Sequence, residues 1–272
     1  MIAAALGGEL SRSRPVGGGC VHDARQLELS GGTRVFVKSG RGAAAQWLAS
    51  EAMGLELLAQ RIRTPELLGC GELPGGARWL AMEWLEMTPF DKVSWEDLGR
   101  QLAALHGVGS DRCGLDHDNF IGGTPQSNGW MDGWTGFFIE RRLRPQLELA
   151  RKNGHAVPER DALRLAESAL AGHEPAASLL HGDLWSGNAA GLSDGRAVVF
   201  DPAPYHGDAE TDLAMLELFA GPLPAAFFRG YGQVDPSRET RRPVYDLYHA
   251  LNHLNLFGSG YAGMVRRCLL DG

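Results

Sequence analysis

The feature of this chain that most constrains its fold is a polar loop set between two short apolar runs. The loop reads HGDLWSGN from His181 to Asn188, and the second run, AVVF, ends directly in Asp201. Short apolar runs bounded by polar and glycine-containing clusters are typical of buried strands. The sequence therefore predicts a hairpin-like insert that carries two aspartates and one asparagine in its polar ends.

Asp183, Asn188 and Asp201 match the groups that phosphoryl transfer from a nucleotide requires. One carboxylate must accept the proton of the substrate hydroxyl, and a carboxylate and an amide oxygen must hold Mg²⁺ on the phosphates. The alternative is that the HGD triplet is only a turn before a strand. A second HGD, at 206–208, serves as a comparison, because Leu213 and not asparagine stands five residues beyond its aspartate. The spacing favours a functional role for the first triplet.

The pattern of elements divides the chain into two parts. Up to about residue 86 strand-like runs alternate with glycine turns around one helical stretch, 43–60, whereas helical spacing dominates from Trp95 onward. We predict an α+β fold with two lobes: an N-terminal lobe over 1–86, built on a small antiparallel sheet, and a larger, mainly helical lobe over 87–272. Ligands of such chains usually bind in the cleft between the lobes.

The N-terminal part supplies a cation for phosphates. Lys38 ends the alternating run TRVFVK, and Glu51 lies in the following helix, where its carboxylate could hold the lysine in an ion pair. Taken alone, each is more often a solvated surface residue, and Glu56 is a rival partner. Together with the HGD loop, they predict a Lys38–Glu51 pair in a nucleotide site.

Two further stretches are assigned by position alone. The cluster PVGGGC contains Gly17, Gly18 and Gly19, whose backbone N–H groups could approach a triphosphate, although an ordinary flexible turn is the alternative. The cluster is not a Walker A loop, because no lysine follows at the required spacing. Glu83 and Leu85 end the last N-terminal strand, where backbone groups could pair with an adenine edge. A plain core strand explains that pattern equally well.

Composition sets the class of protein. The 272 residues carry 26 Lys and Arg against 33 Asp and Glu, a formal charge of −7, which argues against a broad surface for nucleic acid or anionic membrane. The four cysteines are far apart and form no C-x-x-C pair, which is typical of a reducing compartment. The chain shows neither a basic leader nor a spanning apolar stretch, so we expect a soluble, cytoplasmic protein.

Over nearly its whole length the chain resembles the fructosamine kinases, the ketosamine 3-kinases of the protein-kinase-like superfamily. HGDLWSGN and LYHALNHLNLFG are much narrower motifs than HGD-x4-N, which aminoglycoside and choline kinases share. Further matching stretches are GGGC from Gly17, VFVK ending at Lys38, NFIG from Asn119, PQSN from Pro125, FF at 137–138 and RLRPQ from Arg142.

The resemblance implies a protein-kinase-like fold and an ATP- and Mg²⁺-dependent kinase. Its substrate would be a ketosamine, the Amadori adduct of a sugar on an amine, phosphorylated on the 3-hydroxyl so that the unstable product sheds the sugar. By position, Asp183 would be the catalytic base, and Asn188 and Asp201 the Mg²⁺ ligands. Lys38 would bind phosphate, braced by Glu51, and backbone atoms at 83 and 85 would contact adenine.

Other residues receive weaker assignments. Trp185 is the expected wall for the sugar, although a tryptophan is also common in a core. Asp212 resembles the buried helix carboxylate that braces the catalytic loop in kinase-like folds, and His181 is grouped with it as structural support. Asp208 and Glu210 could attract the protonated amine of the substrate, but a solvated, acidic helix N-terminus explains them as well.

The sequence leaves several alternatives open. Cys20 could be oxidised or form an intermolecular disulfide, or it could be a silent small residue. The protein could be a monomer or a homodimer, acting on small-molecule or protein-linked ketosamines, with no nucleic acid or membrane as partner. Rival functions are a kinase for aminoglycosides or amino alcohols and a nucleotide-binding regulator without catalysis.

Overall fold

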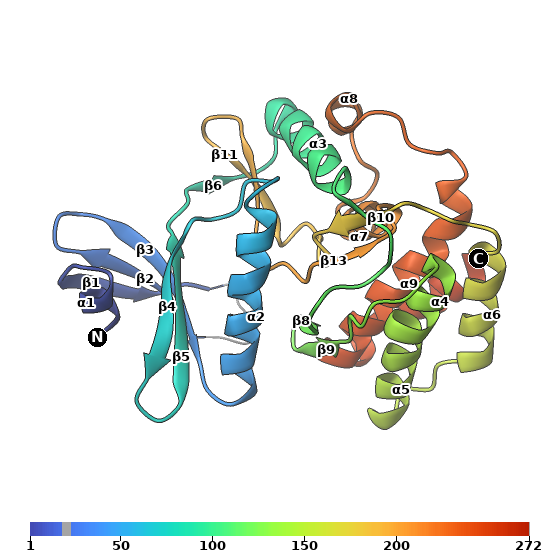
Figure 1. Cartoon of the computed structure of the whole chain (residues 1–272), viewed down its shortest axis with the longest axis horizontal. Coiled ribbons are helices and arrows are strands. Elements are labelled where there is room, and N and C mark those ends of the chain that lie inside the picture. The colour runs from blue at the N-terminus through green and yellow to red at the C-terminus, as the bar shows by residue number, and fades with distance from the viewer. Residues whose placement is uncertain (18–22, 272) are drawn as a thin grey trace.

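The N-terminal part of the protein is a five-stranded antiparallel sheet with the strand order β1-β2-β3-β5-β4. The computed structural model describes residues 1–17 and 23–271, and Figure 1 shows the sheet at one end of the molecule. The strands are β1 (Leu10–Pro15), β2 (Asp23–Leu29), β3 (Arg34–Gly40), β4 (Leu67–Leu73) and β5 (Ala77–Glu83). The short helix α1 (Ile2–Ala5) precedes them, and α2 (Ala43–Leu58) follows β3.

Alternation along β5 explains why the sheet has two different faces. Trp79 and Ala81 pack into one apolar cluster, whereas Leu80 and Met82 pack into another with Leu55 of α2. Successive side chains of a strand point to opposite faces, so one strand serves both clusters. Helix α2 therefore covers the face that carries Leu80.

Strand pairing attaches the segment after β5 to the second part of the chain. After β5 the chain forms β6 (Met87–Thr88), which pairs with β11 (Ala189–Leu192). Strand β12 (Ala197–Val199) completes this three-stranded sheet. Because β6 is the first strand that pairs outside the N-terminal sheet, we keep 1–86 and 87–272 as the predicted lobes.

The second part is mainly helical (Figure 1). Its helices are α3 (Lys92–His106), α4 (Trp134–Phe138), α5 (Arg144–Lys152), α6 (Glu159–Ala169), α7 (Glu210–Ala220), α8 (Ala225–Tyr231), α9 (Arg238–Phe257) and α10 (Ala262–Asp271). A π-helical turn, Ile139–Leu143, joins α4 to α5, and a 3₁₀ turn, Ser259–Tyr261, precedes α10. Strand β10 (Ala177–Leu180) lies between β7 (Gly109–Ser110) and β13 (Tyr205–Gly207), and β8 (Asn119–Ile121) pairs with β9 (Thr124–Gln126).

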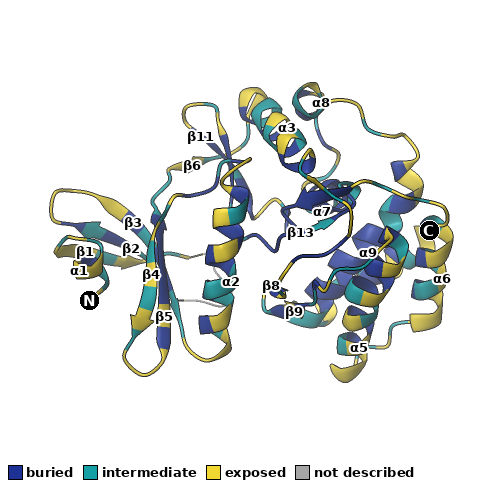
Figure 2. Cartoon of the chain, viewed as in Figure 1, coloured by how far each residue is buried: buried dark blue, intermediate teal, exposed yellow. Residues whose placement is uncertain are grey.

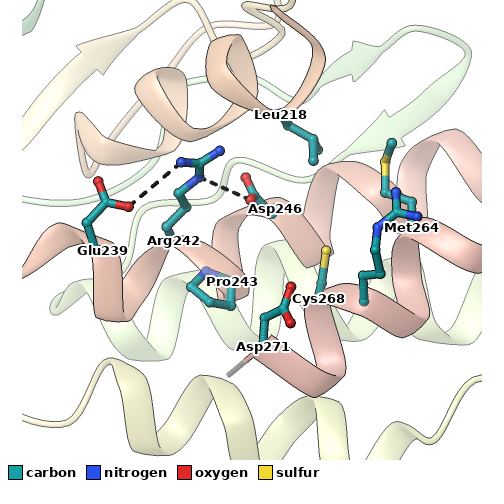
Figure 3. Close-up of a pocket in the computed structure, with 9 residues that line it drawn as sticks. Leu218, Glu239, Arg242, Pro243, Asp246, Met264, Cys268 and Asp271 are labelled. Atoms are coloured by element: carbon teal, nitrogen blue, oxygen red, sulfur yellow. Dashed lines mark hydrogen bonds and ion pairs between the residues drawn. The ribbon is translucent and has the colours of Figure 1, made fainter. Parts of the chain in front are cut away.

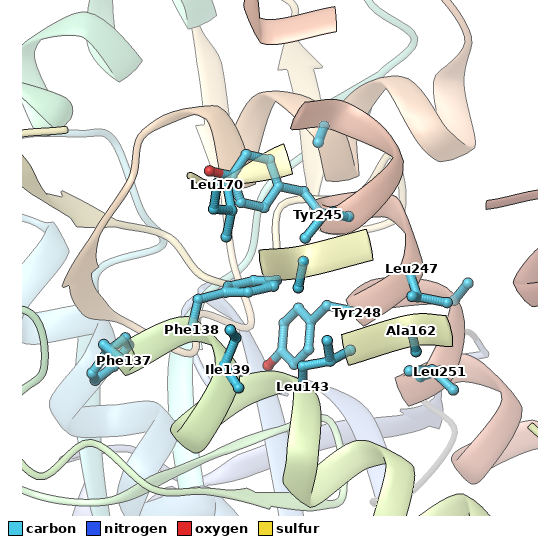
Figure 4. Packing of buried hydrophobic residues seen from close by; sticks show 14 of the residues in the cluster. Phe137, Phe138, Ile139, Leu143, Ala162, Leu170, Tyr245, Leu247, Tyr248 and Leu251 are labelled. Carbon is cyan, nitrogen blue, oxygen red and sulfur yellow. The ribbon is translucent and has the colours of Figure 1, made fainter. Parts of the chain in front are cut away.

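Aromatic side chains fill the core of the helical part (Figure 4). Phe138 of α4 lies with its ring centroid 5.4 Å from that of Tyr245 and 5.9 Å from that of Tyr248, both in α9. Figure 2 shows α9 buried over much of its length. Each large apolar side chain buried in this way contributes about 1.5–3 kcal/mol, so α9 is the helix around which this part is built.

Helices α3 and α8 approach each other through two glycines. A Cβ atom on Gly99 would lie 2.2 Å from the carbonyl oxygen of Phe227, and one on Gly230 would lie 2.0 Å from that of Glu96. No larger residue fits either position without separating the helices.

The predicted α+β fold, with an antiparallel sheet and a helical lobe, is confirmed. The helical spacing of residues 132–152 predicts one continuous helix, whereas the structure has three helical segments there, because a π-helical turn interrupts the α-helix. Helices α8 and α10 were not predicted from the sequence. Among the described residues, no helix combines the length and the apolar character needed to cross a membrane.

Candidate active site

Strands β10 and β11 hold the HGD loop between them. β10 is buried throughout and ends at Leu180, and β11 begins at Ala189, so residues 181–188 form a compact loop. Gly182 has a φ of +79°, and a Cβ atom there would lie 2.0 Å from the carbonyl oxygen of Ala203. Only glycine satisfies both the left-handed backbone and the closed space.

Asp183 and Asn188 contact each other inside this loop. The amide nitrogen of Asn188 donates to the carbonyl oxygen of Asp183 at 2.9 Å and to its carboxylate Oδ2 at 3.2 Å. Both residues are buried. Because the side-chain nitrogen Nδ2 of Asn188 faces Asp183, the side-chain oxygen Oδ1 of Asn188 is left to act as a ligand atom.

Asp201 follows β12 in a strained conformation. Its φ of +56° is the one positive value at a non-glycine residue in the part of the chain that the structure describes. A left-handed backbone costs a non-glycine residue about 1–3 kcal/mol and persists only where the surroundings enforce it. The side chain is nevertheless 43% exposed, so a held backbone presents an accessible carboxylate.

Lys38 connects the N-terminal sheet to Asp201. In β3 it lies opposite Leu80, on the sheet face that α2 covers. Its Nζ lies 2.8 Å from Glu51 Oε1 and 2.5 Å from Asp201 Oδ1. The structure thus contains the Lys38–Glu51 contact and adds Asp201 to it, while the rival Glu56 is exposed.

These contacts set the charges of the group. Burial opposes a charge on Lys38, but Asp201 and Glu51 outweigh it, so the pKa of Lys38 is raised and the ammonium group stays charged. Partial burial disfavours the charged form of Asp201, yet Lys38 holds the pKa of that carboxyl below its usual range. Burial, and after it the neighbouring charge on Asp201, raises the pKa of Glu51 and outweighs the attraction to Lys38.

The pKa of Asp183 is shifted in the opposite direction to that of Asp201. Burial, and after it the charge on Asp201, raises the pKa of Asp183 to about 8. A general base works best when its pKa lies near the operating pH. Asp183 therefore takes up a proton far more readily than Asp201 does, as expected if Asp183 accepts the proton of a substrate and Asp201 stays ionised to bind a cation.

Asp212 of α7 braces the loop from beneath. Its carboxylate accepts the backbone N–H of His181 at 2.7 Å and that of Gly182 at 2.9 Å, and it lies 3.2 Å from Nε2 of His106. Burial opposes the charge on Asp212, but the hydrogen bonds from His106 and from the backbone N–H of Gly182 hold the pKa of this carboxyl below its usual range. The contact of His106 with Asp212 was not predicted from the sequence, since no motif around His106 in α3 points to a partner in α7.

The ring of His181 joins the loop to the chain before Asp201. Its Nε2 lies 3.1 Å from the carbonyl oxygen of Phe200, and its Nδ1 lies 3.3 Å from the backbone nitrogen of Asp183. Burial lowers the pKa of His181, so the ring is neutral. A neutral ring with its proton on Nε2 satisfies both contacts. His181 and Asp212 thus both contact the backbone of the HGD loop, and their role as structural support stays a prediction.

The donor set fits Mg²⁺. Asp201 offers an accessible, ionised carboxylate, and Asn188 offers a neutral amide oxygen beside the carboxylate of Asp183. Mg²⁺ prefers such oxygen ligands and usually takes only one or two carboxylates, with substrate phosphates completing its shell.

Trp185 lies within the HGD loop, and its ring has aromatic neighbours. Its ring centroid is 5.8 Å from that of Phe219 and 6.2 Å from that of His253. The ring folds over Gly187, where a Cβ atom would lie 2.2 Å from it. A contact between Trp185 and the sugar stays a prediction.

Asp208 and Glu210 have internal partners. Strand β13 runs antiparallel to β10, so Asp208 follows at the end of β10 farthest from the HGD loop. Its buried carboxylate accepts the hydroxyl of Tyr245 at 2.5 Å and lies 2.7 Å from Nε2 of His173. Glu210 forms a two-point ion pair with Arg241 at 2.6 and 2.8 Å. This arrangement supports neither the attraction of a substrate amine nor, for Asp208, a solvated helix N-terminus.

His173, Asp208 and Glu210 offer ligand atoms within 4.8 Å of one another. Their polar atoms, however, are already bound to protein groups, including Tyr245 and Arg241. We therefore assign no metal site to this cluster.

The predicted adenine edge carries one backbone group that is already bonded. The N–H of Glu83 donates to the carbonyl oxygen of Glu66 at 2.9 Å, and its carboxylate pairs with Arg63 Nη2 at 2.5 Å. The N–H of Leu85 makes no backbone hydrogen bond among the described residues. Leu85 is thus the better placed of the two to donate to a nucleotide.

The glycine cluster is described only at its first residue. Gly17 is exposed, and no atom lies within 4 Å of the position of a Cβ atom on it. Gly18, Gly19 and Cys20 lie outside the described residues. Their predicted roles, in phosphate binding and in redox chemistry, stay predictions.

A surface cavity of about 320 Å³ lies away from these residues, against α7, α9 and α10 (Figure 3). Arg242 at its edge pairs with Glu239 at 3.7 Å and with Asp246 at 3.3 Å. Burial raises the pKa of Asp246 to about 7. The cavity contains none of the predicted site residues and belongs to a separate part of the surface.

Comparison with known proteins identifies the family of the chain. The sequence profile of the fructosamine kinase family matches residues 2–271. A protein of Synechocystis sp. named probable ketoamine kinase is 43% identical over 96% of this chain and 91% of its own length. The chloroplastic protein-ribulosamine 3-kinase of Arabidopsis thaliana is 38% identical over 97% of this chain and 83% of its own.

Solved structures show the same fold. A crystal structure of a protein from Thermobifida fusca, assigned as a fructosamine-3-kinase, superposes with a TM-score of 0.87 at 31% identity and covers 99% of this chain and 97% of its own. The choline kinase LicA of Streptococcus pneumoniae superposes with a TM-score of 0.70 at 15% identity, covering 99% and 95% of the two chains. The fold is thus protein-kinase-like, and the chain belongs to the fructosamine kinase family.

Proposed function

We propose that this protein is an ATP- and Mg²⁺-dependent kinase that phosphorylates the 3-hydroxyl of ketosamines. The observation that carries the proposal is the convergence of Lys38 and Glu51 from the N-terminal part with Asp201 from the second part, beside the Asp183–Asn188 contact. Membership of the fructosamine kinase family supports this substrate class.

In the proposed reaction Asp183 orients the sugar hydroxyl and accepts its proton as the oxygen attacks the terminal phosphorus of ATP. The bond from that phosphorus to the bridging oxygen breaks, and ADP leaves with the electron pair. Positioned proton transfer of this kind typically contributes about 10²–10⁴-fold to the rate. The raised pKa of Asp183, about 8, supports its assignment as the proton acceptor.

Lys38 and the metal ligands act on the nucleotide. Lys38 carries a charge that Glu51 and Asp201 maintain, and this ammonium is suited to hold phosphate oxygens. Asn188 and Asp201 would hold Mg²⁺, which supplies positive charge against the phosphates. Backbone groups at Glu83 and Leu85, and the glycines 17–19, are proposed for the adenine and phosphate contacts.

The instability of the phosphorylated product gives the proposed reaction its biological role. A ketosamine 3-phosphate is unstable and releases the sugar, so the free amine is regenerated. We propose that the substrate is a small-molecule or protein-linked ketosamine and that the enzyme acts in the cytoplasm. Trp185, which lies in the same loop as Asp183, is the proposed wall for the sugar.

The test is ADP release with Mg-ATP in the presence of ribulose-lysine, fructose-lysine, kanamycin or choline, with Asp183→Asn as control. Turnover on a ketosamine that disappears in the variant supports the proposal and ranks the two sugars. Turnover only on kanamycin or choline assigns the protein to another class of small-molecule kinase. ATP binding without turnover on any acceptor refutes the proposal in favour of a regulatory function.

A further inference from the structure

A pair of buried amide side chains contacts the backbone that follows Asp201. Asn119 of β8 and Gln126 of β9 lie opposite each other in their hairpin, and each is 3% exposed. Nε2 of Gln126 donates to the carbonyl oxygen of Ala203 at 3.1 Å, and Nδ2 of Asn119 donates to that of Pro204 at 2.8 Å. Because a carbonyl can only accept, each amide must turn its nitrogen toward this backbone.

The orientation of Gln126 is fixed by two further contacts. Its Nε2 also donates to Oδ1 of Asn119 at 2.8 Å, and its Oε1 accepts the hydroxyl of Tyr248 at 2.7 Å. Tyr248 belongs to α9 and is itself buried in the aromatic core. Both polar atoms of the Gln126 side chain therefore have partners, and a satisfied buried network favours a single arrangement.

The segment after Asp201 depends on such outside support. Pro202 and Pro204 have no N–H, so of these residues only Ala203 donates a backbone hydrogen bond, to the carbonyl of His181 at 2.9 Å. A single backbone hydrogen bond constrains this segment only weakly, although the segment begins at Asp201, whose backbone is in the strained left-handed region. The amides of the β8–β9 hairpin supply the additional contacts.

The carbonyl of Ala203 is also the point where this segment meets the catalytic loop. It lies so close to Gly182 that a Cβ atom there would be 2.0 Å away. The oxygen is thus held between Gly182, which precedes Asp183, and the amide of Gln126. A shift of this carbonyl would move Asp201, two residues earlier, and would change its position relative to Asp183.

We propose that Gln126 is a positioning residue of the phosphoryl-transfer site, which sets Asp201 against the Asp183 loop through the carbonyl of Ala203. Asn119 and Tyr248 hold Gln126 in the required orientation. The inference rests on the proposed function, since it takes Asp201 as a metal ligand. Groups that orient metal ligands from behind typically affect metal affinity or activity by about 10–100-fold.

Three variants test this role. Gln126→Glu keeps the shape of the side chain but replaces the donor that faces Ala203 with an oxygen. Tyr248→Phe removes only the hydroxyl that orients Gln126. Tyr245→Phe is the matched control, because it makes the same change three residues away in α9, at an equally buried position whose hydroxyl donates to Asp208 instead.

Two readouts are needed for each variant. The first is turnover of a ketosamine as a function of Mg²⁺ concentration, which separates kcat, the KM for the ketosamine and the half-saturating metal concentration. The second is binding of Mn²⁺ in the presence of ADP, followed by electron paramagnetic resonance, which requires no turnover. A purely structural role would lower the melting temperature without changing the metal dependence.

We expect Gln126→Glu to raise the half-saturating metal concentration about tenfold or more in both assays and to lower kcat, with the KM for the ketosamine unchanged. Tyr248→Phe shifts both in the same direction by less, and Tyr245→Phe leaves both at the wild-type value. The inference is overturned if the first two variants bind and use the metal as the control does.

The two levels of the proposal can fail separately. If Gln126→Glu does not fold, the comparison of Tyr248→Phe with Tyr245→Phe decides the question. If the wild-type protein does not turn over any ketosamine, the proposed function is wrong, while binding of Mn²⁺ with ADP still decides the role of Gln126.

Discussion

Lys38 and Asp201 are 163 residues apart in the sequence, and their side chains meet with Nζ 2.5 Å from Oδ1. The contact joins strand β3 of the N-terminal sheet to the segment just after β12 (Ala197–Val199). Oε1 of Glu51 lies 2.8 Å from the same ammonium group. The cation of the site is therefore in place in the free protein, where it links the two parts of the chain.

Replacing the shared cation tests this link. Lys38→Met leaves two carboxylates without their partner, and loss of one member of a buried ion pair typically costs about 3–5 kcal/mol. We expect the free energy of unfolding, measured by urea denaturation, to fall by about 3 kcal/mol and turnover to be lost. Addition of Glu51→Gln recovers part of the stability, because it removes one uncompensated carboxylate. Lys152→Met, at an exposed position, is the control, and equal stability of the two lysine variants would contradict the expectation.

Asp183→Asn removes the proposed base and keeps its shape. We expect turnover to fall by at least about 10²–10⁴-fold, while the affinity for ATP, measured by titration calorimetry, stays close to that of the wild type. Near-native turnover in this variant would show that another group accepts the proton.

The raised pKa of Asp183 has a consequence for stability as a function of pH. The carboxyl binds its proton up to about pH 8 in the folded protein, whereas the unfolded value is about 4. Because the folded state holds the proton more tightly, this contribution to stability is fully present below the unfolded pKa and is lost as the pH rises toward 8.

The same Asp183→Asn variant measures this contribution. Asparagine has no proton to lose, so the melting temperature of the variant exceeds that of the wild type by several degrees near pH 8.5, and the difference shrinks toward about pH 5.5. Differential scanning fluorimetry across this range checks the slope. A difference that does not change with pH would mean that Asp183 titrates normally.

Asp212 is expected to be the most sensitive support of the loop. It accepts two backbone N–H groups with two oxygens, and asparagine can accept only one of them and turns an N–H₂ toward the other. Leaving a buried donor unsatisfied costs about 1–3 kcal/mol, so Asp212→Asn lowers the free energy of unfolding by this amount and reduces turnover. Asp132→Asn, at a highly exposed position, is the control in the same denaturation experiment. Equal stability of the two variants would rule out a bracing role.

The contact between α3 and α8 allows a prediction about glycine. Gly99→Ala places a methyl group 2.2 Å from the carbonyl oxygen of Phe227, and overpacking of a core typically costs about 1–3 kcal/mol. Gly136→Ala, in α4, meets nothing closer than 3.9 Å; it is expected to be neutral or slightly stabilising, since alanine favours a helix by about 1 kcal/mol. Thermal denaturation of both variants decides whether the close approach matters.

Much of the site could be predicted from residue types and their spacing, because the parts lie within short segments. The alternating run that ends at Lys38, the helix that carries Glu51 and the HGD loop are all local patterns, and the structure brings them together. The contact of Lys38 with Asp201 could not be predicted, since no local pattern specifies a partner in another sheet.

The predictions that failed also depended on contacts between residues far apart in the sequence. Asp208 and Glu210 have the composition of a solvated helix start, but the antiparallel course of β13 directs them toward His173 and Arg241, inside the protein. Gln126 was recognised only as part of a motif, because its role depends on Ala203, far along the chain. Short helices such as α8 are specified by close packing at Gly99 more than by their own periodicity.

The burial of Lys38 also affects how readily a sugar can modify this lysine, which matters in a protein that is proposed to act on glycated amines. Of the 26 basic residues only three are lysines, at positions 38, 92 and 152. Sugars add to an amine only when it is deprotonated and reachable, and Lys38 is 7% exposed, with a pKa raised by its two carboxylates. The amine on which the proposed reaction depends is thereby shielded from the same lesion that the enzyme would remove.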